Sequence, residues 1–324
     1  MVDEDLRPSA ILTPEAFRNA AAVAMALSTS INVMRHLQAV AEEGRVAVDI
    51  YDVFAGLDGK VPVLCAIKPN GDGRIEDLDA AGGTLAVMSR LRGLLDEACV
   101  GVDGQSLGAR LDAAGVAEGG AVASVGRPVA EGPSLMVLKG NLAPEGAIMK
   151  LGTGAYPSLV FEGRAGVLGD QQAALAAREA GEVRQGDVVV LRGLGALGGP
   201  GVASASWFAA ALAGSALAGQ VALVTDGQLS GLNRGIVVGQ IMPEAAMKGP
   251  LGLVADGDLI RIDIAARVVD LEVPEAELAR RRGGGRPKLK MRDGWLGFYQ
   301  QLVTPLSRGG ILRPGREASE EGKR

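Results

Sequence analysis

Apolar residues recur every three or four positions near the amino terminus, at Phe17, Ala20, Ala21 and Ala24. This period is typical of one face of an α-helix. The helix is predicted to begin after Thr13, because Thr is a good N-cap, Pro14 suits the first turn and Glu15 interacts favourably with the helix dipole. Further helices are predicted over Ile31–Glu43, Glu76–Ala81, Thr84–Ala98, Glu275–Arg282 and Trp295–Val303. Gly44 is predicted to end the second helix as its C′ residue.

Short apolar runs bounded by turn residues predict strands. They cover Val61–Ile67, Gly186–Arg192, Gln220–Val224, Leu259–Ile264 and Val268–Val273. The run at Leu259–Ile264 alternates apolar and polar residues after the turn signal Asp256-Gly257, and Val268–Val273 is its predicted partner. The segment Ala117–Pro133 is rich in Gly, Ala and Pro and has little periodicity, so a domain boundary is predicted near residue 125. The polar tail Gly315–Arg324 is predicted to be disordered.

Composition narrows the possible partners. The chain has 324 residues, enough for about two domains, and a formal net charge of −5. This acidity gives no reason to expect nucleic acid, and the basic run at Arg280–Arg282 is interpreted as part of a solvated linker. The uncharged stretch Gly193–Thr225 is long enough to span a bilayer, but it is broken by Gly-Gly-Pro-Gly and rich in Ala, Gly and Ser. A buried helix followed by a buried strand is therefore predicted, and no membrane association.

The two cysteines, Cys65 and Cys99, are too few and too far apart for a disulfide framework or a tetrahedral metal site. Free thiols suit a reducing compartment, and the acidic amino terminus lacks the apolar run of a signal peptide. A cytoplasmic location is therefore expected.

Two glycine-rich motifs stand out, one inside the uncharged stretch and one at its end. Gly-Gly-Pro-Gly occupies Gly198–Gly201, and Thr-Asp-Gly-Gln-Leu-Ser-Gly-Leu-Asn-Arg-Gly occupies Thr225–Gly235. Glycines allow a backbone to approach a ligand closely. Taken alone, the second motif is interpreted as a glycine-rich strand-to-loop turn in which Ser230 only caps backbone groups.

The two glycine-rich motifs resemble those of the dihydroxy-acid dehydratase and 6-phosphogluconate dehydratase family. Lys139–Lys150 and Asp256–Ile264 also resemble family segments, and all of them follow the family's order along the chain. Only the carboxy-terminal half of the family's sequence is matched. The resemblance implies an α/β protein in which a mostly helical α/β fragment precedes a mixed β-barrel swivelling domain. Residues 1–125 would be the carboxy-terminal part of the family's α/β domain, residues 126–314 the barrel, and residues 315–324 the tail.

The resemblance also implies a hydro-lyase chemistry on a 2,3-dihydroxy acid or a sugar acid. Such a reaction needs a base for the proton next to the carboxylate and a Lewis acid for the departing hydroxyl. The resemblance assigns the base to Ser230. The predicted substrate-binding residues are Gly199, Gly201, Asn141, Arg234 and Lys68. No metal ligand is assigned to this chain; the iron–sulfur cluster and a divalent metal such as Mg²⁺ belong to the complete family enzyme.

Some polar positions depart from the family pattern. Ser204 stands where a glutamate ligates the family's metal, and Gln240 stands where a histidine is usual. The first hypothesis is a subunit of a split dehydratase, completed as a hetero-oligomer by a complementary or full-length dehydratase-like chain. The alternative is a non-catalytic structural or regulatory subunit; a stand-alone binder of small acids is a third. The apolar face Phe17–Ala24 is expected to lack covering without the partner.

Overall fold

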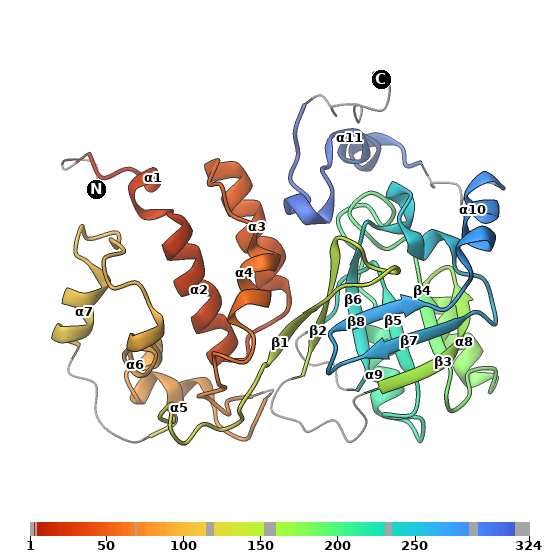
Figure 1. Cartoon of the computed structure of the whole chain (residues 1–324). Helices are drawn as coiled ribbons and strands as arrows, with labels where there is room; N and C mark the ends of the chain where they lie inside the picture. Colours follow the sequence, from red (N-terminus) through yellow and green to blue (C-terminus); the bar gives the residue numbers. More distant parts are fainter. Residues whose placement is uncertain are drawn as a thin grey trace. The chain divides into compact units, whose positions relative to one another are not determined.

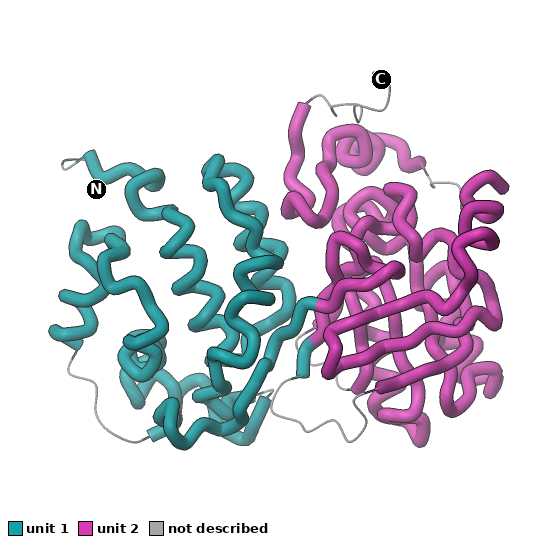
Figure 2. The backbone as a smooth tube through the Cα atoms, in the orientation of Figure 1, with its two compact units in different colours: residues 1–137, 150–157 teal, residues 138–149, 158–324 magenta. Residues whose placement is uncertain are grey.

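The computed structural model describes residues 3, 5–68, 70–114, 120–151, 160–230, 235–284 and 291–314. It divides into two compact units (Figure 2). Unit 1 comprises residues 1–137 and 150–157, and unit 2 comprises residues 138–149 and 158–324. The mixed α/β fold expected from the sequence is confirmed, with eleven α-helices and an eight-stranded sheet in the described residues (Figure 1).

Unit 1 is mostly helical. Its helices are α1 (Pro8–Ile11), α2 (Pro14–Ala26), α3 (Asn32–Gly44), α4 (Ile50–Leu57), α5 (Ile75–Ala80), α6 (Gly83–Arg90) and α7 (Leu107–Ala113). The predicted start of α2 is confirmed, because the Thr13 side chain accepts a hydrogen bond from the Ala16 amide at 3.2 Å. Helices α2, α3 and α4 pack beside one another and bury Phe17, Tyr51 and Phe54 (Figure 1).

Three expectations for unit 1 are wrong. Gly44 is the last residue of α3, and the left-handed position after it is taken by Arg45, with φ of 54°. The apolar run Val61–Ile67 makes only isolated bridges, at Val63, Cys65 and Ile67, because no neighbouring segment extends the pairing. The face Phe17–Ala24 is not left uncovered, since α4 and α6 pack against α2 and leave Phe17 only 3% exposed.

The sheet has the order β1-β2-β6-β5-β4-β3-β7-β8. Its strands are β1 (Leu135–Leu138), β2 (Gly146–Lys150), β3 (Val160–Leu168), β4 (Val188–Leu191), β5 (Ala222–Thr225), β6 (Val237–Met242), β7 (Leu259–Asp263) and β8 (Val268–Leu271). A parallel bridge between Lys139 and Val268 joins the two ends of this order. The predicted mixed β-barrel is therefore confirmed as a nearly closed sheet.

Burial explains why the strands differ in composition. Strands β4, β5 and β6 lie in the middle of the sheet, pair in parallel and are buried at every position. Parallel strands covered on both faces are expected to be continuous apolar runs. Strands β7 and β8 pair antiparallel and alternate in burial, which fits one covered face. The predicted pairing of these last two strands is confirmed.

Strand β3 links the two kinds of pairing. Its second half pairs in parallel with β4, and its first half pairs antiparallel with β7. Gly163 lies in that first half, where a Cβ atom would overlap the Gly186 carbonyl oxygen. The strand therefore requires glycine at this close approach.

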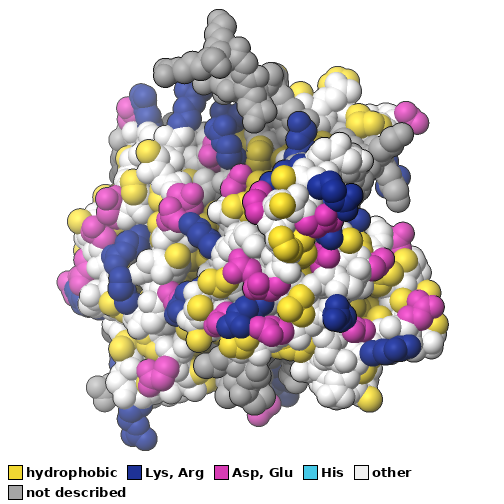
Figure 3. Space-filling view, turned by 45° about the vertical axis from the view of Figure 1, so that its right-hand side comes forward, with side chains coloured by type: hydrophobic (Ala, Val, Ile, Leu, Met, Phe, Trp, Pro, Cys, Tyr) yellow, Lys and Arg dark blue, Asp and Glu magenta, His cyan; other side chains and the backbone are white. Residues whose placement is uncertain are grey.

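The helices of unit 2 are α8 (Gln171–Glu179), α9 (Ser206–Ala213), α10 (Glu275–Gly283) and α11 (Gly294–Leu302). Helix α8 packs on β3 and β4. The last two helices confirm the predictions near residues 275 and 295. None of the described helices is long and apolar enough to cross a membrane. Acidic and basic side chains are interspersed on the face shown in Figure 3.

Asn141 fastens the segment after β1 to β8. Its side-chain amide donates to the Leu271 carbonyl at 3.0 Å, and its side-chain oxygen accepts from the Leu271 amide at 2.7 Å. The Asn141 backbone amide also donates to Asp270 at 2.7 Å. This side chain therefore takes the place of a strand partner where the sheet closes.

We expect Asn141→Ala to lower the free energy of unfolding by about 1–3 kcal/mol, because both Leu271 backbone groups lose their partner. Urea denaturation monitored by circular dichroism measures the change. Gln220→Ala removes an exposed local hydrogen bond to Ala216 and is the matched control. Equal effects of the two substitutions would contradict a role for Asn141 in closing the sheet.

Candidate functional site

Three loops of unit 2 follow three neighbouring parallel strands. The loops begin after Leu191 in β4, Thr225 in β5 and Met242 in β6. Because the strands are parallel, their carboxyl ends lie at the same edge of the sheet. In α/β proteins this edge is the usual place for a ligand. The structure therefore brings the predicted residues Gly199, Gly201 and Ser230 to adjacent loops.

The first loop, residues 193–201 and called here the glycine loop, folds back on itself. The Gly199 amide donates to Gly195 at 2.9 Å, and the Gly201 amide donates to Ala196 at 3.1 Å. A Cβ atom on Gly199 would lie 2.6 Å from the Leu194 carbonyl oxygen. Gly201 has φ of 93°, in the region that favours glycine. Both predicted positions therefore need glycine for the shape of the loop itself.

Asp226 fastens this loop to its neighbours. Its fully buried carboxylate accepts hydrogen bonds from the amides of Gly193 at 3.0 Å, Leu194 at 2.9 Å and Ala245 at 3.0 Å. Burial raises the pKa of Asp226 above its ordinary value, and the three amide donors oppose that rise. One side chain thus joins the loops after β4, β5 and β6.

Glu244 supports the other half of the glycine loop. Its carboxylate accepts a hydrogen bond from the Leu197 amide at 2.7 Å, and the residue is only 2% exposed. A Cβ atom on Gly195 would overlap Oε2 of Glu244. The absence of a side chain at Gly195 therefore makes the room that this carboxylate occupies.

Ser230 is half-buried in the second loop, which follows β5. Two residues earlier, the Gln228 amide donates to Ala203 at 2.9 Å, and the Ala205 amide donates to Gln228 at 2.8 Å. These bonds pair the segment leading to Ser230 with the segment after the glycine loop. Ser204 lies between the paired residues, and its hydroxyl donates to Ser206 at 2.8 Å.

The other predicted residues are Arg234, Lys68 and Asn141. Arg234 lies outside the described residues. Lys68 is exposed in unit 1, and the amide of Asn141 is engaged with Leu271. Their substrate contacts remain predictions.

The sequence analysis gave Asp226 no role. It is nevertheless the one charged residue between Arg192 and Arg234, and it lies inside the second glycine-rich motif. Glu244, which follows β6, was likewise given no role. Both residues could have been found from the sequence, because each is an acid among residues that predict burial. A buried carboxylate needs hydrogen-bond donors, so such an acid is expected to hold neighbouring segments together.

Lys150 was also missed. Its ammonium group donates to the carbonyl oxygens of Ser28 at 2.9 Å and Thr29 at 3.0 Å, within unit 1. Ser28 is fully buried and has φ of 48°. Burial lowers the pKa of Lys150 to about 8. The lysine thus holds the turn that precedes α3, and at neutral pH it does so at the cost of a partly buried charge.

The described residues offer few ligands for an iron–sulfur cluster or a divalent metal. Among the described residues, no three or more His, Cys, Asp or Glu side chains come together. Cys65 is buried, and burial raises the pKa of its thiol to about 11, which disfavours the thiolate form that binds iron. Ser204 offers a hydroxyl, a weaker ligand than carboxylate for a hard divalent cation. These residues do not fit either group.

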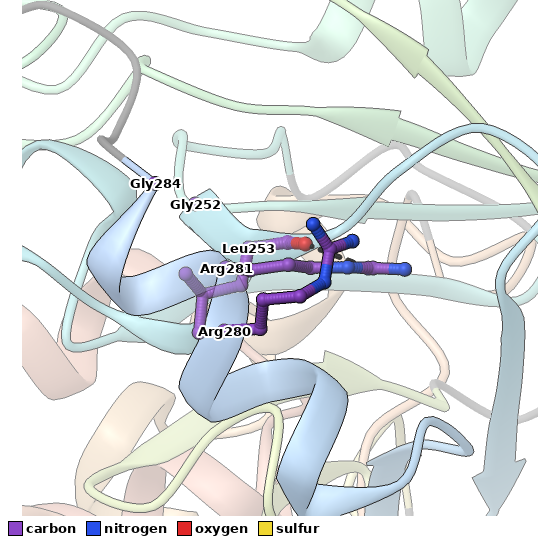
Figure 4. Close-up of a pocket in the computed structure, with 5 residues that line it drawn as sticks. All are labelled: Gly252, Leu253, Arg280, Arg281 and Gly284. Carbon is purple, nitrogen blue, oxygen red and sulfur yellow. Dashed lines mark hydrogen bonds between the residues drawn. The ribbon is translucent and has the colours of Figure 1, made fainter.

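A cavity of about 260 Å³ in unit 2 is lined by Gly252 and Leu253, which follow β6, and by Arg280, Arg281 and Gly284 (Figure 4). Arg281 donates to the Leu253 carbonyl and forms ion pairs with Asp258 and Glu277. Arg280 also pairs with Glu277. Because local carboxylates already balance these guanidinium groups, the cavity offers little attraction to an anion.

The fold and the loops define an α/β protein with a nearly closed mixed sheet and a glycine-loop site at the carboxyl edge of its parallel strands. Sequence comparison gives the family. The profile described as Dihydroxy-acid/6-phosphogluconate dehydratase C-terminal matches residues 120–310, and the corresponding N-terminal profile matches residues 1–110. The chain belongs to the dihydroxy-acid/6-phosphogluconate dehydratase family.

Individual relatives agree with this assignment. The chain is 43% identical over 316 residues to a dihydroxy-acid dehydratase of Pyrococcus abyssi, covering 97% of this chain and 57% of the relative. It is 41% identical over 315 residues to one of Moorella thermoacetica, covering 96% of this chain and 57% of the relative. The chain therefore spans little more than half the length of these relatives.

Lys150 gives a pH-dependent contribution to stability with a defined sign. Its pKa in the folded protein, about 8, lies below the ordinary value of 10.5, so the folded protein releases this proton more readily than the unfolded chain. The difference in unfolding free energy, wild type minus Lys150→Met, should therefore increase as the pH rises between these two values.

Urea titrations at a series of pH values across this window measure the difference. Lys60→Met, which changes a lysine bonded to Gly56 at the surface, is the matched control. Equal pH slopes for the two variants would contradict a burial cost at Lys150.

Proposed function

We propose that this chain is a subunit of a split dehydratase, a hydro-lyase acting on a 2,3-dihydroxy acid or a sugar acid. The observation that carries the proposal is the pairing of the segment leading to Ser230 with the segment after the glycine loop, at the carboxyl edge of three parallel strands. The relatives named dihydroxy-acid dehydratase support the reaction class.

The chemistry assigned to this chain is a proton transfer. As an alkoxide, Oγ of Ser230 would accept the proton from the carbon next to the substrate carboxylate. The hydroxyl on the following carbon would leave as hydroxide, for which the partner chain would supply the Lewis acid. A serine oxygen becomes a base only when its pKa is strongly lowered by a nearby cation. Gly199 and Gly201 leave the loop backbone open to the substrate, and Arg234, Asn141 and Lys68 are the proposed polar contacts.

A partner chain completes the proposed enzyme. The described residues do not fit an iron–sulfur cluster or a divalent metal such as Mg²⁺, so we assign both groups to a complementary or full-length dehydratase-like chain. The resulting hetero-oligomer would lie in the cytoplasm, where the free thiols of Cys65 and Cys99 remain reduced.

The alternative is a non-catalytic structural or regulatory subunit of such an enzyme. Ser204 favours it, because this position lacks the carboxylate expected of a family member and its hydroxyl is bonded to Ser206. The two functions share the fold and differ in whether Ser230 reacts.

In the assembled complex, Ser230→Ala should lower turnover by about 10²–10⁴-fold, the usual contribution of general acid–base catalysis, while leaving assembly intact. Steady-state dehydration and size-exclusion chromatography measure the two properties. Ser215→Ala, which removes a hydroxyl bonded to Leu212 at the end of α9, is the matched control. Dehydration by the Ser230→Ala complex at the rate of this control would refute the catalytic function and leave the structural one.

The isolated chain should bind no iron–sulfur cluster, because Cys65 and Cys99 are its only thiols. Anaerobic reconstitution followed by iron and sulfide analysis provides the measurement. A stoichiometric cluster in the isolated chain would overturn the assignment of this group to the partner.

A further inference from the structure

Two buried carboxylates hold the glycine loop from opposite halves. We propose that Asp226 and Glu244 are positioning residues, which fix the glycine loop against the segment carrying Ser230 before any ligand arrives. The proposal rests on the proposed function only for the class of ligand, a small hydroxy acid.

Asp226 holds the first half of the glycine loop. It lies directly after β5, in the same loop as Ser230, and it accepts amide hydrogen bonds from Gly193, Leu194 and Ala245. The loop after β4 and the loop after β6 are thereby joined to the loop that carries Ser230. A carboxylate can accept all three bonds, because each of its oxygens has two acceptor sites.

Asparagine cannot replace it fully. Oδ1 of Asp226 accepts from Leu194, and Oδ2 accepts from both Gly193 and Ala245. An amide nitrogen at either place would direct its own hydrogens toward backbone donors. At least one of these connections must then be lost.

Glu244 holds the glycine loop further along, at Leu197. The Leu197 amide donates to it, and Gly195 lies against the same carboxylate. A methyl group at residue 195 would displace the carboxylate without changing any acidic residue. Gly195→Ala therefore tests the same contact as a substitution of Glu244.

These bonds also limit how a ligand can be recognised. The amides of Gly193, Leu194 and Leu197 point to protein carboxylates, so they are not available to bind an anionic ligand. The amides of Gly199 and Gly201 are also engaged, with the carbonyl oxygens of Gly195 and Ala196, so they hold the loop together as well. A ligand would therefore be recognised by groups other than these amides.

The experiment measures amide-resolved hydrogen exchange by NMR on the full chain. Asp226→Asn should speed exchange at Gly193, Leu194 or Ala245 by at least about tenfold, since these are local openings. Glu244→Met and Gly195→Ala should each do so at Leu197, while protection in β4 and β5 stays as in the wild type.

Two controls match these changes. Asp170→Asn alters a carboxylate that caps α8 by accepting from Ala173, and Asn caps a helix almost equally well. Gly166→Ala adds a methyl group where a Cβ atom has nothing within 4 Å. Unchanged exchange in the glycine loop would overturn the proposal. Faster exchange throughout β4 and β5 would also overturn it, by showing that the carboxylates stabilise unit 2 as a whole.

Ligand binding separates positioning from a merely structural role. D-gluconate, titrated as a simple sugar acid and followed at the Ser230 amide, should bind about tenfold more weakly to Asp226→Asn than to the wild type. Equal gluconate affinities of Asp226→Asn and the wild type would overturn the positioning role, even if amide exchange in the glycine loop were faster in the variant. If the wild type binds no gluconate, this chain alone does not form the sugar-acid site of the proposed function, and loop exchange alone decides the role of the carboxylates.

Discussion

The hydrogen bonds accepted by Asp226 are the interaction on which the arrangement of the site depends. A carboxylate with no exposed surface needs donors, and here they come from the backbone of two other loops. Parallel pairing of β4, β5 and β6 makes this possible, because it brings the three loops to one edge. The raised pKa of Asp226 indicates that its charge still costs stability there.

Features set by neighbouring residues could be predicted from the sequence. The Thr13 cap of α2 is a contact between residues three apart, and the alternation in β7 reflects one covered face. The strand expected at Val61–Ile67 could not be corrected from sequence, because a strand exists only where another segment pairs with it. The same limit applies to Gly44 and Arg45, where either residue can take the left-handed position and packing decides.

The part of the candidate site that lies in local sequence motifs could be predicted. The glycines at residues 199 and 201 and the serine at residue 230 could be found in this way. The supporting groups could not, since Glu244 contacts Leu197 and Lys150 contacts Ser28 over long distances along the chain. Their significance lies in burial, which a single sequence does not display. Asn141 likewise has a long-range contact that its motif does not indicate, because its side chain is bonded to Leu271.

The contact between Asn141 and Leu271 also bears on how the protein reaches its folded state. The two residues are 130 positions apart in the chain. Bringing such distant segments together costs more loop entropy than forming the local helices, and long-range pairing slows folding. We therefore expect the sheet to close late, after the central parallel strands have assembled. Until then, β8 and the segment after β1 present unpaired edges, which makes the incompletely closed sheet the species most prone to aggregate.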